Sequence, residues 1–196
     1  VRARRFGGGN VVHQLGHLQP VLVGTQCCIA LDRQGFCLVP HETGVEDFYR
    51  LESQQADYEA EITALVLQAI GAHSAMVFDH TLRSDSRDLR GQHSTREPAS
   101  VIHNDYTDAS AAIRLRDLLP APEAQQRLNR RFAIVNVWRS INGPVINSPL
   151  AICDFSSADT ADFVASERRA KERIGELELV TYNPTHRWYY FSEQQF

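Results

Sequence analysis

The stretch VIHNDYTDAS, residues 101–110, places a histidine and an aspartate two positions apart, directly after two β-branched apolar residues. Alternate residues of a strand point to the same face, so His103 and Asp105 would present an imidazole and a carboxylate side by side. Such a pair suits a metal ion, but a histidine and an aspartate at this spacing also occur by chance. A polar turn at the end of a strand is the simpler interpretation of these residues alone.

A second histidine in a later aromatic stretch, His186, makes the metal interpretation stronger. Two histidines and one carboxylate with open positions form the ligand set of non-haem iron(II) oxygenases. Three ligands on one face leave three positions for a co-substrate and dioxygen, and the aspartate balances the charge of the metal. The residues are therefore compatible with His103, Asp105 and His186 as a ligand set, if strands of a barrel bring them together.

The composition indicates a soluble globular protein with a single domain, residues 1–196. Hydrophobic residues make up 43% and charged residues 22% of the sequence, which is ordinary for that class. The net charge of −4 argues against a nucleic-acid partner, and no apolar run approaches the roughly 18 to 20 residues of a membrane span. The four cysteines lack a CxxC spacing, which fits reduced thiols, so we expect a cytoplasmic location.

Apolar periodicity predicts a helix within residues 52–74, ended by Gly71. Its buried face would carry Tyr58, Ile62, Leu65, Val66, Ala69 and Ile70. A second helix is expected across residues 110–129, broken at its two prolines. A third is expected to open in residues 156–164, where a Ser-to-Asp spacing resembles a capping box.

Short apolar runs bounded by turn residues predict strands in the remaining segments. These are residues 20–31, 35–43, 75–83, 131–139, 148–155, 176–182 and 186–191. Helices fall mainly between the early strands, and strands dominate the second half, which favours an α+β fold with a β-sandwich or jelly-roll core. Residues 1–20 would form an N-terminal arm, and the charged, turn-rich residues 84–98 a mobile loop that acts as a lid.

Five blocks in one order carry a resemblance to a known family. They are FDHTLR (residues 78–83), HNDYT (103–107), NVWRSINGPV (136–145), PLAICD (149–154) and NPTHRWYYF (183–191). Together they resemble a bacterial and fungal family of secondary-metabolism oxygenases, the hydroxylase/desaturase family related to the accessory protein of cephamycin 7α-methoxylation. The resemblance covers most of the chain from about Leu31 onward. It implies a double-stranded β-helix (jelly-roll, cupin-like) core with flanking helices, Fe(II) and 2-oxoglutarate as cofactors, and His103 and Asp105 as the first two iron ligands.

The sequence departs from the family's pattern after residues 186–191. In the family, that strand is followed by segments that resemble the distal iron-binding histidine and the arginine for the far carboxylate of 2-oxoglutarate. The sequence ends at Phe196, and we expect it to be incomplete at its C-terminus, because a final strand would leave a sheet edge unpaired. On this expectation His186 only lines the site. If the natural chain is short, His186 is the third ligand.

The resemblance also implies roles for residues around the metal. Asn136 and Arg139 are candidates to bind a carboxylate of the co-substrate or the substrate, because an arginine fork suits a carboxylate. Tyr106, Arg187 and His80 are candidates to contact the substrate, although a structural hydrogen bond is the simpler role for His80.

We therefore expect an iron(II)- and 2-oxoglutarate-dependent oxygenase that uses dioxygen to hydroxylate, desaturate or cyclise a small natural-product intermediate by C–H abstraction. One alternative is a non-catalytic accessory protein that docks to a pathway enzyme, and association with a second copy is also open. Another is a zinc hydrolase built on the same His–Asp pair. Turnover of 2-oxoglutarate distinguishes the oxygenase from both.

Overall fold

The computed structural model of the chain describes residues 2–3, 19–20, 30–170 and 173–190. Its helices, with short 3₁₀ turns marked η, are α1 (Leu31–Gln34), η1 (Phe48–Ser53), α2 (Gln55–Ile70), α3 (Arg87–Gln92), α4 (Asp108–Leu118), α5 (Ala121–Leu128), η2 (Phe155–Ser157) and η3 (Thr160–Asp162). Its strands are β1 (Arg2–Ala3), β2 (Gln19–Pro20), β3 (His103–Asn104), β4 (Val135–Asn136), β5 (Ala151–Cys153), β6 (Phe163–Ala170), β7 (Arg173–Val180) and β8 (Trp188–Tyr190).

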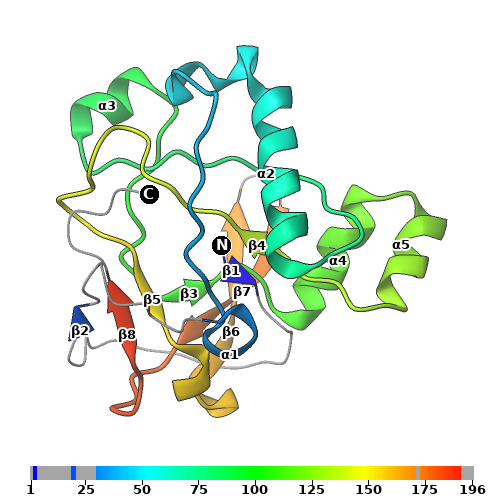
Figure 1. Ribbon diagram of the computed structural model, residues 1–196. Coiled ribbons are helices and arrows are strands. Elements are labelled where there is room, and N and C mark those ends of the chain that lie inside the picture. The colour runs from blue at the N-terminus through cyan, green and yellow to red at the C-terminus, as the bar shows by residue number, and fades with distance from the viewer. Residues whose placement is uncertain (1, 4–18, 21–29, 171–172, 191–196) are drawn as a thin grey trace.

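Within these residues the strands form two three-stranded sheets and one two-stranded pair. In the first sheet, β7 lies between β3 and β6 and is antiparallel to both. In the second, β8 lies between β2 and β5, parallel to β2 and antiparallel to β5. The two-stranded pair joins β1 to β4. Figure 1 shows the strands at the centre and lower left, with α2, α4 and α5 grouped above and to the right. The expected mixture of helices and strands is confirmed.

The strand that carries His103 is held in place by β7. His103 pairs with Leu179, and Asn104 lies directly opposite Glu178. The Nδ2 amide of Asn104 donates to Oε2 of Glu178 over 3.0 Å, and the Glu178 side chain is fully buried. Because a shift of one residue would turn Asn104 away from this buried carboxylate, the hydrogen bond fixes the register of β3 on β7.

The helix α4 begins immediately after the His–Asp stretch and is tied to the same strand. Thr107 accepts a hydrogen bond from the Ser110 amide, and the Ser110 hydroxyl accepts one from the Thr107 amide. The Thr107 hydroxyl also donates to the Glu176 carboxylate, and the Ser110 hydroxyl donates to the Glu176 carbonyl. This capping box starts the helix, and its bonds to β7 stop β3 at Asn104.

The main apolar cluster lies along one face of α2. Tyr58, Ile62 and Val66 recur every four residues and are buried, as the helical period predicts. Val135 and Val137, on either side of Asn136, pack against this cluster. The helix ends at Gly71, whose φ of 63° is left-handed, and α4 and α5 are separated at the prolines as expected. No helix within the described residues is both long and apolar enough to span a membrane.

The helix predicted in residues 156–164 is wrong. This segment forms the two 3₁₀ turns η2 and η3 and then enters β6, which pairs with β7 along its whole length. Asp154 accepts from the Ser156 amide, and Asp159 and Asp162 cap η3 reciprocally. Side chains that bond to nearby backbone in this way compete with helix formation, and the long pairing with β7 overrides the local pattern.

Other predicted elements differ in extent. Residues 35–43 contain no strand, and residues 131–139 contain only β4. The predicted loop 84–98 contains α3, which is closed off by a bridge between Arg83 and Arg96. The predicted arm and first strand, at residues 1–31, lie mostly outside the described residues. The strands expected around the NPT turn exist, but β7 and β8 belong to different sheets.

The buried pair of Asn104 and Glu178 makes a prediction about stability. Asn104→Leu removes an amide donor from a buried carboxylate, so we expect the free energy of unfolding to fall by about 2 to 3 kcal/mol. Urea unfolding of the variant and of an exposed control, Asn147→Leu, measures the difference. The control should change stability by less than about 0.5 kcal/mol. Equal stabilities of the two variants would contradict this role of the pair.

Candidate functional site

The structure brings His103 and Asp105 together, as the spacing predicts. Nε2 of His103 lies 3.4 Å from Oδ1 of Asp105. The His103 side chain is 23% exposed and the Asp105 side chain is 39% exposed, so both can be reached from solvent. His103 on β3 and Asp105 in the bend that follows it flank buried Asn104, whose side chain is bonded to Glu178 instead.

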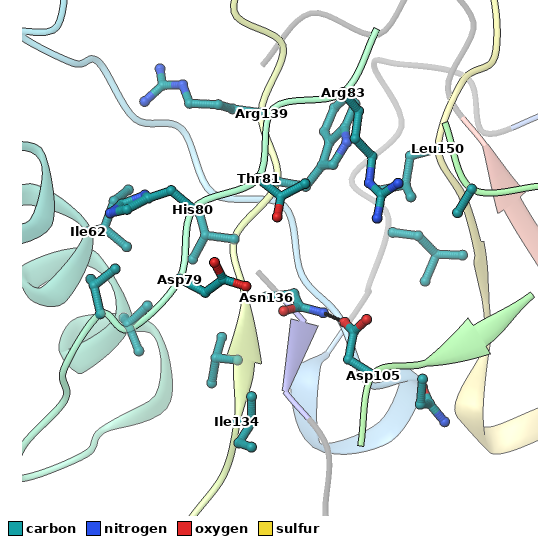
Figure 2. A pocket seen from close by; sticks show the side chains of 18 of the residues that line it. Ile62, Asp79, His80, Thr81, Arg83, Asp105, Ile134, Asn136, Arg139 and Leu150 are labelled. Atoms are coloured by element: carbon teal, nitrogen blue, oxygen red, sulfur yellow. Dashed lines mark hydrogen bonds between the residues drawn. The ribbon is translucent and has the colours of Figure 1, made fainter. Parts of the chain in front are cut away.

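Each member of the pair has a second contact on its outer side. The Nδ1 atom of His103 lies 2.7 Å from the Val101 carbonyl. A carbonyl only accepts, so Nδ1 carries the hydrogen and, in the neutral ring, Nε2 holds the lone pair beside Asp105. Oδ2 of Asp105 accepts a hydrogen bond from Nδ2 of Asn136 over 2.6 Å (Figure 2).

This arrangement fits two ligands of a divalent metal. A metal-binding histidine commonly donates its other ring hydrogen to a carbonyl or carboxylate, and a metal-binding carboxylate is commonly hydrogen-bonded as well. Both features are present in the pair. Within the described residues, no group of three His, Cys, Asp or Glu side chains is placed to hold a metal ion. The pair therefore offers two candidate ligands.

The pair lines a hollow that we call the central hollow. Six of the eight predicted site residues line it, namely His80, His103, Asp105, Tyr106, Asn136 and Arg139. Figure 2 shows apolar side chains, including Ile62, Ile134 and Leu150, on its walls. The hollow has a volume of about 2770 Å³, which is more than a single small molecule fills.

Arg139 lies toward α2 rather than beside Asp105 (Figure 2). Its guanidinium carbon is 5.4 Å from the centre of the Phe48 ring, and its Nη1 is 3.4 Å from Nδ1 of His41. Its Nε is buried and has no hydrogen-bond partner among the described residues. Burial raises the pKa of the neighbouring Tyr58, and the positive charge of Arg139 acts in the opposite direction.

His80 and Tyr106 occupy different parts of the central hollow. Nε2 of His80 is 3.1 Å from the Glu59 carboxylate on α2. Hydrogen bonds from Gln55 and from His80 lower the pKa of Glu59. Tyr106 follows the His–Asp pair, and its ring packs edge-on against Phe78 at 6.5 Å.

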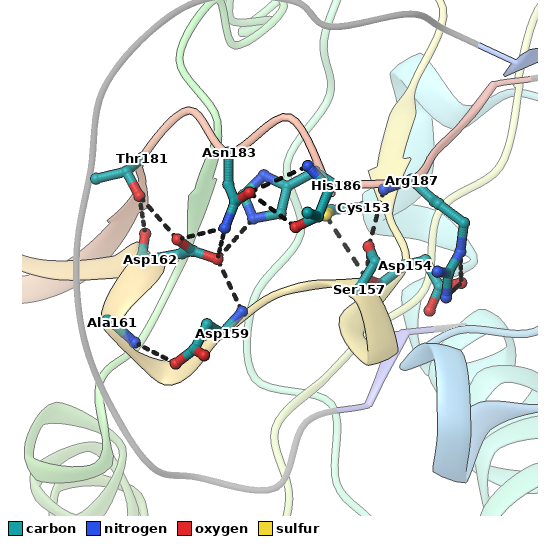
Figure 3. A network of polar contacts seen from close by, with 11 residues as sticks. Cys153, Asp154, Ser157, Asp159, Ala161, Asp162, Thr181, Asn183, His186 and Arg187 are labelled. Atoms are coloured by element: carbon teal, nitrogen blue, oxygen red, sulfur yellow. Dashed lines mark hydrogen bonds and ion pairs between the residues drawn. The ribbon is translucent and has the colours of Figure 1, made fainter.

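The structure does not bring His186 to the other two predicted ligands. Nε2 of His186 lies 2.9 Å from Oδ2 of Asp162, and the His186 side chain is 2% exposed. Asn183 donates to the same carboxylate (Figure 3). His186 does not line the central hollow. It is a buried histidine that binds Asp162, so we do not retain it as a ligand.

Arg187 is also engaged away from the central hollow. Its Nε and Nη2 donate to Oδ2 of Asp154 over 3.1 and 2.9 Å, and the Asp154 side chain is 1% exposed. The remaining oxygen of Asp154 accepts from the amide and hydroxyl of Ser156. The predicted substrate contact of Arg187 is therefore replaced by an ion pair that joins η2 to the start of β8.

The sequence did not identify two buried carboxylates as important. Glu178 accepts a hydrogen bond from Asn104 on β3, and Asp162 binds Asn183 and His186. Glu178 lies in the alternating run ELEL, and alternation alone identifies two faces of a strand without saying which is buried. Asp162 lies in a run of Asp, Ser and Thr that was interpreted as a helix start. The Asn-Pro-Thr turn was the available sequence signal for Asp162, because the side-chain amide of Asn183 in this turn donates to that carboxylate.

A protein-family model described as "Oxidoreductase/YMDC permease-like domain" matches residues 23–196 of the chain. The chain is 28% identical to the "Hydroxylase/desaturase efuI" of Hormonema carpetanum, over 89% of this chain and 67% of that protein. It is 29% identical to the "Fe(II)/2-oxoglutarate-dependent dioxygenase nvfI" of Aspergillus novofumigatus, over 84% of this chain and 60% of that protein.

The fold matches a solved structure, the "iron and alpha-ketoglutarate-dependent endoperoxidase NvfI", with a TM-score of 0.70 and 22% sequence identity. The match covers 85% of this chain and 63% of that one. The chain thus has the fold of that enzyme over most of its length and spans roughly three fifths to two thirds of these relatives.

The network around Asp162 makes a prediction about pH. Burial opposes ionisation of Asp162, but hydrogen bonds from the Asp159 amide, His186 and Asn183 outweigh it and lower its pKa below the usual 3.8. The carboxylate therefore stabilises the fold above pH 3.8, and this contribution is lost as the pH falls through the lower folded-state value. Asp162→Asn should cost about 1 to 3 kcal/mol at pH 7.

Urea unfolding between pH 7 and pH 3 measures this effect. The difference in the free energy of unfolding between the unaltered protein and Asp162→Asn should shrink below pH 3.8. The exposed control Glu42→Gln should have nearly the same free energy of unfolding as the unaltered protein at both pH 7 and pH 3. A difference that stays constant down to pH 3 would show that the Asp162 charge does not contribute.

Proposed function

We propose that this chain, which belongs to the Oxidoreductase/YMDC permease-like domain family, is an iron(II)- and 2-oxoglutarate-dependent oxygenase. Its substrate would be a small natural-product intermediate, and dioxygen would be the oxidant. One observation carries the proposal: His103 and Asp105 lie 3.4 Å apart, each with the outer hydrogen bond that orients a metal ligand. The names of two relatives, a hydroxylase/desaturase and an Fe(II)/2-oxoglutarate-dependent dioxygenase, support it.

In this proposal His103 and Asp105 are two of the protein ligands of Fe(II). Iron and 2-oxoglutarate, when bound, supply with dioxygen the chemistry that removes hydrogen from an unactivated carbon. The chain's own part is to hold the substrate and to keep water away from it. The apolar walls of the central hollow suit both tasks, and Tyr106 and His80 are proposed to contact the substrate.

Arg139 is proposed to bind a carboxylate of 2-oxoglutarate. Its position in the central hollow and its buried Nε without a partner among the described residues support this role. Residues 84–98, with α3, are proposed to cover the hollow, because several of them line it.

Two finer assignments belong to the same proposal. The sheets β3-β7-β6 and β2-β8-β5 would be parts of a double-stranded β-helix, which is supported by their separate three-stranded ladders. Within the family, the five sequence blocks favour the branch related to the accessory protein of cephamycin 7α-methoxylation. Hydroxylation, desaturation and ring closure all fit this assignment, because each begins with removal of hydrogen from carbon.

Anaerobic titration of the protein with Fe(II) and 2-oxoglutarate tests the proposed function. We expect a weak visible charge-transfer band that is lost in His103→Ala and in Asp105→Ala and is kept in the exposed control Glu42→Ala. No band in the unaltered protein would reject the oxygenase. Co-elution with another enzyme would then favour an accessory protein.

Arg139→Lys tests the proposed carboxylate contact separately. Lysine keeps the charge but loses the planar fork, so we expect about ten times more 2-oxoglutarate to be needed for half of the band, which corresponds to about 1.4 kcal/mol. The affinity for the metal alone should not change. An unchanged 2-oxoglutarate requirement would reject this role of Arg139.

A further inference from the structure

The Asp105 carboxylate is reached by an amide from a different element. Nδ2 of Asn136, on β4, donates to Oδ2 of Asp105 over 2.6 Å, and the two residues are 31 positions apart in the sequence (Figure 2). Oδ1 of the same carboxylate is the oxygen that lies 3.4 Å from Nε2 of His103. The two oxygens of Asp105 thus face different groups.

Neither burial nor the β-ladder holds this carboxylate. Its side chain is 39% exposed, and β3 ends one residue earlier, at Asn104. A carboxyl group on a single rotatable bond turns readily, and a turn would exchange the oxygen beside His103. The hydrogen bond from Asn136 opposes partial turns, because a rotated carboxylate plane would carry one oxygen away from the amide and the other away from the imidazole. A half-turn only exchanges two equivalent oxygens, so the hydrogen bond fixes the plane of the carboxylate.

Asn136 is itself well placed to act as a fixed support. Its neighbours Val135 and Val137 pack against the apolar cluster of Tyr58, Ile62 and Val66 on α2. The backbone of β4 is therefore anchored by the core, while the Asn136 side chain points out of it toward Asp105 (Figure 2). A donor held by a rigid element loses little freedom when it orients a ligand.

We infer that Asn136 is a positioning residue that fixes the rotation of the Asp105 carboxylate and so presents Oδ1, together with His103 Nε2, to the metal. This rests on the proposed function, because it concerns the same metal site. It also replaces the earlier expectation that Asn136 binds the co-substrate, because its amide is already engaged by Asp105.

Titration of the protein with Co(II) alone, without 2-oxoglutarate, tests the inference. Asn136→Leu keeps the approximate size of the side chain but removes the donor. Loss of an outer hydrogen bond to a metal ligand typically weakens binding 10- to 100-fold, so we expect a loss of about that size. We also expect the visible Co(II) spectrum to change, because the freed carboxylate can offer either or both oxygens to the metal.

Three further variants show whether a change in Co(II) binding is due to the lost amide donor. Asn136→Gln keeps an amide donor at an exposed position and should restore most of the affinity and the original spectrum. Asn129→Leu, an exposed residue at the end of α5 and outside the central hollow, should bind Co(II) as the unaltered protein does. Asp105→Ala should lose binding. Thermal unfolding of each variant shows that the fold is kept, and the Gln variant remains informative if the Leu variant unfolds.

The outcomes separate this inference from the proposed function. If the unaltered protein binds no Co(II), the metal site itself is refuted. If the unaltered protein and Asn136→Leu bind Co(II) equally and with one spectrum, only the positioning role is refuted. If Asn136→Leu binds Co(II) as tightly as the unaltered protein does but binds 2-oxoglutarate more weakly, Asn136 contacts the co-substrate instead.

Discussion

The pairing of β3 with β7 is the constraint on which the site depends. Asn104 and Glu178 face each other in register and share a buried hydrogen bond, while Glu176, two residues away on the same strand, binds the cap of α4. A buried carboxylate that lost its partner would be costly, so this register has little freedom to slip. β7 therefore determines where β3 ends and α4 begins.

The metal-binding geometry that we propose follows from this constraint. The Asn104 side chain is bonded to Glu178, and the His103 and Asp105 side chains on either side of it approach each other to 3.4 Å. The strand fixes the backbone of His103, and Asp105 follows in the bend before α4, but neither element fixes the rotation of the side chains. The Val101 carbonyl does that for the imidazole, and Asn136 does it for the carboxylate.

The sequence predicted local features well and distant ones poorly. The helix α2, the break between α4 and α5 and the adjacency of His103 and Asp105 each depend on residues within a few turns of one another. The helix predicted in residues 156–164 is wrong because the Asp and Ser side chains there suit several local conformations, and only the long pairing of β6 with β7 decides among them. Glu178 was missed because a run of alternating residues does not show which face the fold covers.

Short-range patterns and motifs were enough to identify the periodic helix, the proline break, the candidate family and the first two candidate ligands. The tertiary structure alone decided which side chains meet: Asn136 reaches Asp105 across 31 positions, and His186 binds Asp162 rather than the other predicted ligands. The physical reason is that local conformation follows from short-range sterics and hydrogen bonds. Contacts between sheets depend instead on strand order and register, which are set by the packing of the whole chain.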